Sequence, residues 1–115
     1  MTLVDTSVWI DHLRKSDPEL SVLLDEGRVL VHPFVIGEIA CGTLRHRAEV
    51  LAHLRRLPGA PLASSDEVHH LLEMHDLAGC GLGWIDLHLL AASRLVPCRL
   101  LTHDRRLRDV ADSLV

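Results

Sequence analysis

The hydrophobic positions of the chain fall into two kinds of segment, continuous apolar runs and runs with helical spacing. Three short continuous runs, residues 1–4, 28–31 and 98–102, indicate buried strands, because strands covered on both faces lack a polar alternation. A fourth run, residues 60–63, contains Pro61, which cannot donate a hydrogen bond to a neighbouring strand. This run therefore predicts a short edge strand.

The segments between these runs have apolar residues at the three- and four-residue intervals of helices that bury one face. Asp17 followed by Pro18 is a helix start signal, and Pro33 opens a helix directly after the second strand. Thr6 or Ser7 is expected to cap the first helix. The expected helices cover residues 7–15, 18–27, 33–41, 44–57, 64–79, 84–95 and 104–114.

The order of these segments predicts a single α/β domain over residues 1–115. Strands that alternate with helices form a parallel sheet, and continuously apolar strands require helices on both faces of that sheet. A chain of 115 residues is large enough for one hydrophobic core and too small for two. The expected fold class is therefore a doubly wound parallel sheet.

Composition and charge narrow the class of protein further. No apolar run approaches the ~20 residues of a membrane span, and the N-terminus lacks a signal-peptide pattern, so we expect a cytoplasmic protein without a membrane partner. Three widely spaced cysteines favour free thiols over a disulfide or a zinc site. A net charge of −4 excludes a generally basic surface. Any binding of nucleic acid must therefore be local or involve metal ions.

Four acidic residues occupy positions that can converge in such a fold. Asp5 and Asp104 follow the ends of two strands, and Glu38 and Asp86 lie near the starts of two helices. Strand ends and helix starts share one rim of a doubly wound sheet. Three of the acids have ordinary explanations: Asp104 as a helix cap, Asp86 as a favourable charge at a helix N-terminus, and Glu38 as a solvated helix residue. Asp5 is less ordinary, because a carboxylate directly after a buried strand needs a partner.

Convergence of these carboxylates would favour a bound cation. Two carboxylates about 4 Å apart repel by roughly 4 kcal/mol at an effective dielectric constant of about 20, against a total stability of about 5–15 kcal/mol for a domain. Either some of the acids are protonated or a divalent cation lies among them. Oxygen ligands favour Mg²⁺ or Mn²⁺ over zinc, and the natural reaction of such a site is phosphoryl chemistry.

Four stretches of the sequence resemble PIN-domain ribonucleases, most closely the VapC-type toxins of bacterial and archaeal toxin–antitoxin pairs. They are VDTSVWI (residues 4–10), IGEI (36–39), GWIDLHLLAAS (83–93) and LTHDRRL (101–107), in the order and spacing of that family. The resemblance implies an acidic quartet that binds Mg²⁺ or Mn²⁺, formed by Asp5, Glu38, Asp86 and Asp104. It also implies that Ser7 and Thr102 are hydroxyls that support this quartet.

The same resemblance implies a sheet ordered 3-2-1-4-5, whose first four strands lie near Leu3, Val29, Pro61 and Leu100. Relatives usually add a short fifth strand after the last helix, where this sequence ends. The expected order is therefore 3-2-1-4, with the fifth strand lacking and the fourth strand at a sheet edge.

The expected function is that of an endoribonuclease toxin that depends on Mg²⁺ or Mn²⁺. It would hydrolyse RNA phosphodiester bonds, leave 5′-phosphate and 3′-hydroxyl ends, and inhibit translation and growth. Arg105 and Arg106 either contact flanking phosphates or form a solvated basic turn.

Two partners are implied by the resemblance, a cognate VapB-like antitoxin and a second copy of the chain in a homodimer. An antitoxin segment could bind over apolar positions of the first two helices, although the same residues could equally pack the core. These positions are Trp9, Leu13, Leu20 and Leu24.

Two alternative functions remain. A receiver-type signalling domain has a similar length and an acidic Mg²⁺ pocket, but it needs a lysine late in the chain, and the only lysine here is Lys15. A non-catalytic PIN scaffold is the other alternative, and the complete set of four acids argues against it.

Overall fold

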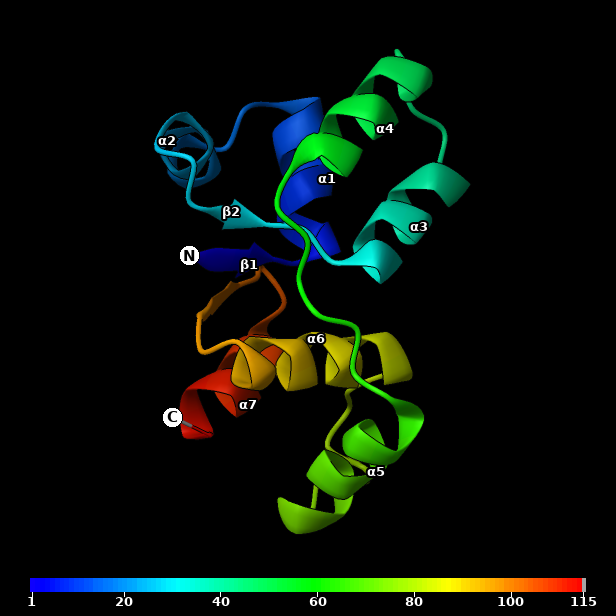
Figure 1. Ribbon diagram of the computed structural model, residues 1–115, viewed down its shortest axis with the longest axis vertical. Helices are drawn as coiled ribbons and strands as arrows, with labels where there is room; N and C mark the ends of the chain where they lie inside the picture. The colour runs from blue at the N-terminus through cyan, green and yellow to red at the C-terminus, as the bar shows by residue number, and fades with distance from the viewer. Residues whose placement is uncertain (115) are drawn as a thin grey trace.

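The computed structural model describes residues 1–114 and shows a three-stranded parallel sheet between two layers of helices (Figure 1). The central strand β1 (Thr2–Val4) lies between β2 (Val29–Leu30) and β3 (Arg99–Leu101), in the order β2-β1-β3. Leu3 of β1 pairs with Leu30 of β2 and with Leu100 of β3. The predicted α/β class with a parallel sheet is confirmed, and β3 is an edge strand within the described part of the chain.

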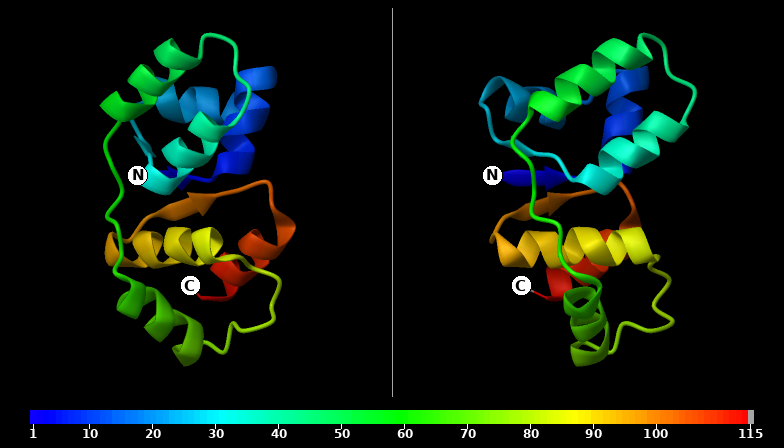
Figure 2. Two further views of the ribbon diagram at one scale, coloured as in Figure 1. Left: turned by 90° about the vertical axis from the view of Figure 1, so that its right-hand side faces the viewer. Right: turned by 45° about the vertical axis from the view of Figure 1, so that its right-hand side comes forward.

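The helices divide between the two sides of the sheet in chain order. On one side lie α1 (Thr6–Arg14), α2 (Pro18–Asp25), α3 (Pro33–Cys41) and α4 (Arg47–Arg56). On the other side lie α5 (Ser65–Met74), α6 (Trp84–Leu95) and α7 (Arg105–Ser113), and the 57–64 segment joins the two layers (Figure 2). Among residues 1–114, no helix has the length and apolar character needed to cross a membrane.

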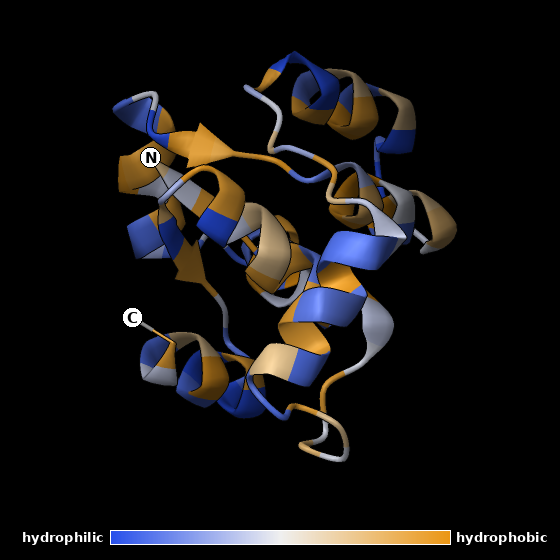
Figure 3. Ribbon diagram, turned by 60° about the horizontal axis from the view of Figure 1, so that its bottom comes forward, coloured by the Kyte–Doolittle hydropathy of each residue, from blue (hydrophilic) through white to orange (hydrophobic). Residues whose placement is uncertain are grey.

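The core forms where the sheet meets both helical layers. All three residues of β1 are buried, and so are Leu87 to Ala92 in the middle of α6. Figure 3 shows the same division, with hydrophobic strands and with helices that carry both polar and apolar surface. Burial on both faces explains why β1 and β2 read as continuous apolar runs in the sequence, whereas Arg99 at the start of the edge strand β3 is exposed.

The helix starts show how local sequence signals act, and in one case correct a prediction. The expected start of α2 is confirmed, because the Asp17 carboxylate accepts a hydrogen bond from the Leu20 backbone N–H at 2.9 Å. The expectation that Thr6 or Ser7 caps α1 is wrong. Asp5 is the N-cap and its Oδ1 accepts from the Thr6 N–H at 2.8 Å, which leaves the two hydroxyls for other contacts.

Three predicted elements are clearly shorter than expected. The helix expected over residues 64–79 ends at Met74, because Asp76 adopts a left-handed conformation with φ of 51° that a right-handed helix cannot contain.

The 60–63 strand is reduced to a single parallel bridge between Val31 and Gly59, supported by a hydrogen bond from the Ala60 N–H to the Val31 carbonyl at 2.8 Å. Pro61 follows directly and has no N–H with which to extend the ladder. The bridge nevertheless lies beside β2, where the expected order placed this strand.

The predicted 44–57 helix begins only at Arg47. Gly42 ends α3 with extended backbone angles, and His46 adopts a left-handed conformation with φ of 54° before α4 starts. A residue with positive φ cannot continue a right-handed helix, so α3 and α4 are separate elements.

The suggested antitoxin-binding face on α1 and α2 is not an exposed surface. Trp9 and Leu20 are buried, and Leu13 and Leu24 are partly buried against the core. Their helical spacing therefore reflects packing against the sheet, which was the alternative explanation of the pattern.

Candidate active site

All four predicted acids line one pocket of about 520 Å³, which we call the acid pocket. Asp5 comes from the end of β1, Asp86 from the first turn of α6, and Asp104 from the turn before α7. Glu38 was predicted near the start of a helix and lies instead in the second turn of α3. It nevertheless lines the same pocket. The complete lining is Asp5, Thr6, Ser7, Glu38, Gly83, Trp84, Ile85, Asp86 and Asp104.

Asp5 is the buried member of the set, with 6% of its surface exposed, and it receives three hydrogen bonds. Its Oδ2 accepts from the Ser7 hydroxyl at 2.8 Å and from the Thr102 hydroxyl at 2.7 Å. Its Oδ1 accepts only the Thr6 N–H among the contacts found within residues 1–114. The predicted need of Asp5 for partners is confirmed.

The Ser7 and Thr102 hydroxyls also connect Asp5 to the segment that carries Asp104. Ser7 Oγ accepts a hydrogen bond from the His103 N–H at 3.0 Å, and Thr102 Oγ1 accepts from the Asp104 N–H at 2.9 Å. Both hydroxyls therefore donate to Asp5 and accept from backbone N–H groups of the segment that carries Asp104. The two acids at opposite ends of the sequence are positioned relative to each other by this network.

Thr6 was not identified from the sequence as a residue of the site. Its hydroxyl donates to Glu38 Oε1 at 2.7 Å, and this contact joins α1 to α3 at the pocket. The available signal was the acid before it: once Asp5 caps α1, the Thr6 side chain is not needed as a cap.

The Asp86 carboxyl is affected by burial and by the charges of the neighbouring acids. Its Oδ2 accepts a hydrogen bond from the Gly83 N–H at 3.0 Å, on the turn that leads into α6. Burial raises the pKa of the Asp86 carboxyl above its ordinary value, the Gly83 hydrogen bond opposes that change, and the charges of Asp5 and Asp104 raise the pKa further. The Asp5 and Asp104 charges therefore act on Asp86 as unfavourable neighbours in the absence of a cation.

Asp104 is both a helix cap and a member of the pocket. Its Oδ1 accepts from the Leu107 N–H at 3.1 Å and caps α7, so the ordinary explanation and the functional one apply together. Arg105 and Arg106 follow it and are exposed. The Arg106 side chain runs along the 79–83 loop, where a Cβ placed on Gly81 would lie 3.0 Å from Arg106 Cδ.

The donor set of the acid pocket fits a divalent cation such as Mg²⁺ or Mn²⁺, because every predicted ligand is a carboxylate oxygen. Within residues 1–114, no three His, Cys, Asp or Glu side chains stand close enough to share one metal ion. This spacing still suits Mg²⁺, which commonly binds through one or two carboxylates and keeps several waters. The charges of Asp5 and Asp104, which raise the pKa of Asp86, are charges that a cation would offset.

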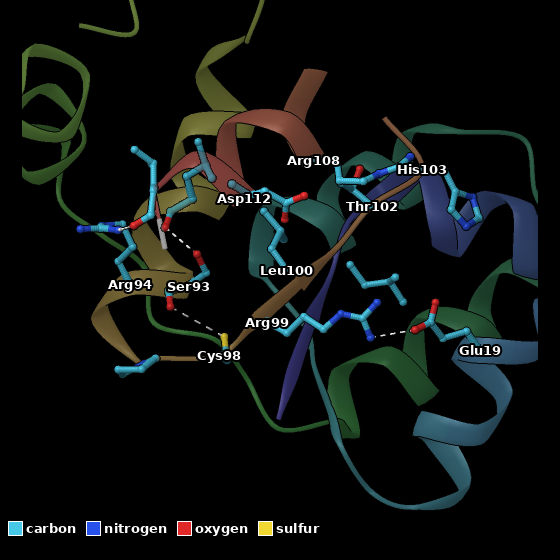
Figure 4. Close-up of a pocket in the computed structure, with 15 residues that line it drawn as sticks. Glu19, Ser93, Arg94, Cys98, Arg99, Leu100, Thr102, His103, Arg108 and Asp112 are labelled. Atoms are coloured by element: carbon cyan, nitrogen blue, oxygen red, sulfur yellow. Dashed lines mark hydrogen bonds and ion pairs between the residues drawn. The ribbon is translucent and has the colours of Figure 1, made fainter. Parts of the chain in front are cut away.

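A larger cavity of about 840 Å³ lies elsewhere, along the edge strand β3 (Figure 4). It is bordered by residues of α6 and α7 and by Glu19 of α2, which forms an ion pair with Arg99 at 2.7 Å. Its lining carries arginines as well as acids, and of the predicted site residues it includes only Thr102. The four predicted acids all line the smaller acid pocket, and none of them lines this cavity.

Comparison with known proteins agrees with the geometry of the site. Residues 2–113 match the PIN domain family. Over 109 residues, covering 94% of this chain and 88% of the relative, the sequence is 45% identical to Ribonuclease VapC32 of Mycobacterium tuberculosis strain CDC 1551 / Oshkosh. It has the same identity and coverage to Ribonuclease VapC32 of strain ATCC 25618 / H37Rv. The chain therefore belongs to the PIN domain family and, within it, to the VapC group.

Proposed function

We propose that this protein is a VapC-type ribonuclease toxin that hydrolyses RNA phosphodiester bonds in the acid pocket with the help of Mg²⁺ or Mn²⁺. The proposal is supported by the VapC relationship over nearly the whole chain and by one structural observation above all. Acids from β1, α3, α6 and the start of α7 line a single pocket.

The residues of the pocket have distinct roles in this proposal. Asp5, Glu38, Asp86 and Asp104 are the cation ligands and the catalytic acids. Ser7 and Thr102 position Asp5 and the Asp104 segment through the hydroxyl network described above. A bound divalent cation would neutralise the phosphate charge and lower the pKa of a coordinated water.

The chemistry left to the chain itself is orientation and proton transfer. The water oxygen attacks phosphorus, the bond from phosphorus to the 3′ oxygen breaks, and a carboxylate oxygen of the pocket accepts the water's proton. Solvent returns a proton to the leaving oxygen, so the products carry 5′-phosphate and 3′-hydroxyl ends. Arg105 and Arg106, exposed beside Asp104, are proposed to contact the flanking phosphates.

The partners and location are part of the same proposal. The VapC relationship supports an RNA substrate and inhibition by a VapB-like antitoxin that restores growth when the two are produced together. The homodimer and the cytoplasmic location expected from the sequence stay predictions. The antitoxin is not expected to bind over Trp9 and Leu20, because both are buried.

The direct test is RNA cleavage by the purified protein with and without Mg²⁺ or Mn²⁺. The parent should cut total cellular RNA only when the cation is present, and Asp5→Asn and Asp86→Asn should fold but lose at least about 100-fold of the rate, as expected for loss of a catalytic acid or base. Asp25→Asn is the matched control, because Asp25 is an exposed acid at the end of α2, outside the acid pocket. Cleavage by Asp5→Asn and Asp86→Asn at the parental rate would refute the proposal.

A further inference from the structure

The acid pocket has one aromatic side chain on its rim, and that side chain is unusually exposed. Trp84 lines the pocket two residues before Asp86, and 41% of its surface is accessible. The chain contains only three Trp, Phe and Tyr residues. Of the others, Trp9 is 4% exposed and Phe34 is half-buried. The most exposed large aromatic group of the protein therefore lies beside the proposed catalytic acids.

The Trp84 ring is held by neighbouring rings. His69 of α5 lies against it with ring centroids 5.0 Å apart, and His88, one turn later in α6, meets it edge-on at 5.1 Å. His88 is itself buried and packs against Phe34 at 4.7 Å. Because these contacts already restrict the indole, it loses little conformational freedom when a ligand stacks on it.

Trp84 differs from the other exposed large apolar side chains among residues 1–114. These are aliphatic, and none lines the acid pocket: Met1, Ile10, Val22, Leu62, Met74, Leu95 and Val96. An exposed, rigid aromatic ring beside a phosphodiester-cleaving site matches the way proteins recognise unpaired RNA bases, which stack on aromatic faces. The net charge of −4 makes such a non-ionic contact more important for binding RNA.

We propose that Trp84 is the stacking platform for an unpaired base next to the cleaved phosphodiester. This inference rests on the proposed ribonuclease function and adds a residue that binds and positions the substrate. A base stacked on Trp84 places the neighbouring phosphate at the acid pocket, because Trp84 and the four acids line the same pocket. Bases inside a duplex are paired and stacked already and cannot use this platform.

The first experiment measures binding without cleavage. In the Asp86→Asn background, a pool of short single-stranded RNA oligonucleotides of random sequence should quench the fluorescence of Trp84, and a duplex RNA of the same length should not. The same titration with Asp86→Asn/Trp84→Phe should leave the emission of buried Trp9 unchanged. Absence of quenching in Asp86→Asn, or equal quenching by duplex RNA, would overturn the proposal.

The second experiment separates stacking from a structural role. Trp84→Leu should raise KM for single-stranded RNA about fivefold to 150-fold, the range that corresponds to ~1–3 kcal/mol of base stacking, with a smaller change in kcat. Trp84→Phe should stay within a few-fold of the parent because it keeps a π face. Leu95→Ala is the control, since Leu95 is 47% exposed at the far end of the same helix.

The two proposals fail in different ways. A parent that cleaves RNA with the same KM as Trp84→Leu would overturn the stacking role and leave the ribonuclease function intact. A parent that neither cleaves nor binds RNA would refute the ribonuclease function, and with it the role of Trp84.

Discussion

Asp5 illustrates how single side chains determine the geometry of the site. It caps α1 with one carboxylate oxygen and accepts two hydroxyl hydrogen bonds with the other, from Ser7 and Thr102. Those hydroxyls come from residues 95 positions apart in the sequence. Sequence reasoning identified these residues through the family resemblance. The hydrogen bonds by which the two hydroxyls accept from the His103 and Asp104 N–H groups required the structure.

At this scale we predict that Thr102→Val is costly and Thr102→Ser is not. Valine removes the donor to Asp5 at the buried Thr102 position and leaves the part-buried Asp104 N–H without its acceptor, whereas serine keeps both hydrogen bonds. The free energy of unfolding should fall by about 1–3 kcal/mol in Thr102→Val, and RNA cleavage should fall with it. Urea denaturation and cleavage rates measure both effects. Equal stability of the two variants would contradict the role assigned to this hydroxyl.

Whole elements were predictable where a local signal decides the structure. Asp17–Pro18 and Pro33 start α2 and α3 as predicted, because capping and proline geometry are local properties. The shortened 60–63 strand and the late start of α4 were not predicted. They depend on strand pairing with Val31 and on the left-handed backbone at His46, which spacing of apolar residues does not report.

The start of α3 carries a pH-dependent interaction. His32 is buried and caps α3, with its Nδ1 accepting a hydrogen bond from the Phe34 N–H at 3.0 Å. Burial, together with the nearby His88, lowers the pKa of His32 from 6.5 to about 4. Protonation at Nδ1 would also remove the acceptor of the cap.

The expected consequence is acid destabilisation with a defined sign. Between pH 6.5 and about 4 the unfolded chain binds a proton at His32 that the folded chain does not. The contribution of the neutral His32 to the free energy of unfolding should therefore be complete above pH 6.5. The free energy of unfolding should fall by up to about 3 kcal/mol as the pH approaches 4. His32→Asn keeps a capping oxygen without a titratable ring, so its stability should depend less on pH over this range. Parallel slopes for both proteins in urea denaturation would contradict the assignment.

For the whole molecule, the balance of charge shapes how RNA can bind. The chain has a net charge of −4, so the overall field repels RNA and attraction must come from local groups. Arg105 and Arg106 stand beside the acid pocket, and neither takes part in an ion pair within the described residues. The convergence of the acids was predictable from chain order and topology. The position of Trp84 in the pocket lining and that of Arg106 beside Gly81 depend on side-chain placement.

A salt titration tests the local contribution of Arg106. Each phosphate contact to single-stranded nucleic acid contributes about −0.7 to the slope of log K against log salt concentration. Arg106→Gln in the Asp86→Asn background should therefore reduce the magnitude of this slope by about 0.7. Arg55→Gln is the matched control, because Arg55 is an exposed arginine of α4 outside the acid pocket. An unchanged slope for Arg106→Gln would remove Arg106 from the RNA-binding surface.

The central claim is that the acid pocket binds a divalent cation through its carboxylates, and cation-dependent thermal stability tests it most directly. Mn²⁺ or Mg²⁺ should raise the melting temperature of the parent and of the control Asp25→Asn, because a ligand that binds only the folded state stabilises it. The same concentrations should have little effect on the melting temperature of Asp5→Asn or Asp86→Asn. A parent whose melting temperature does not respond to either cation, or variants that respond as strongly as the parent, would contradict the account.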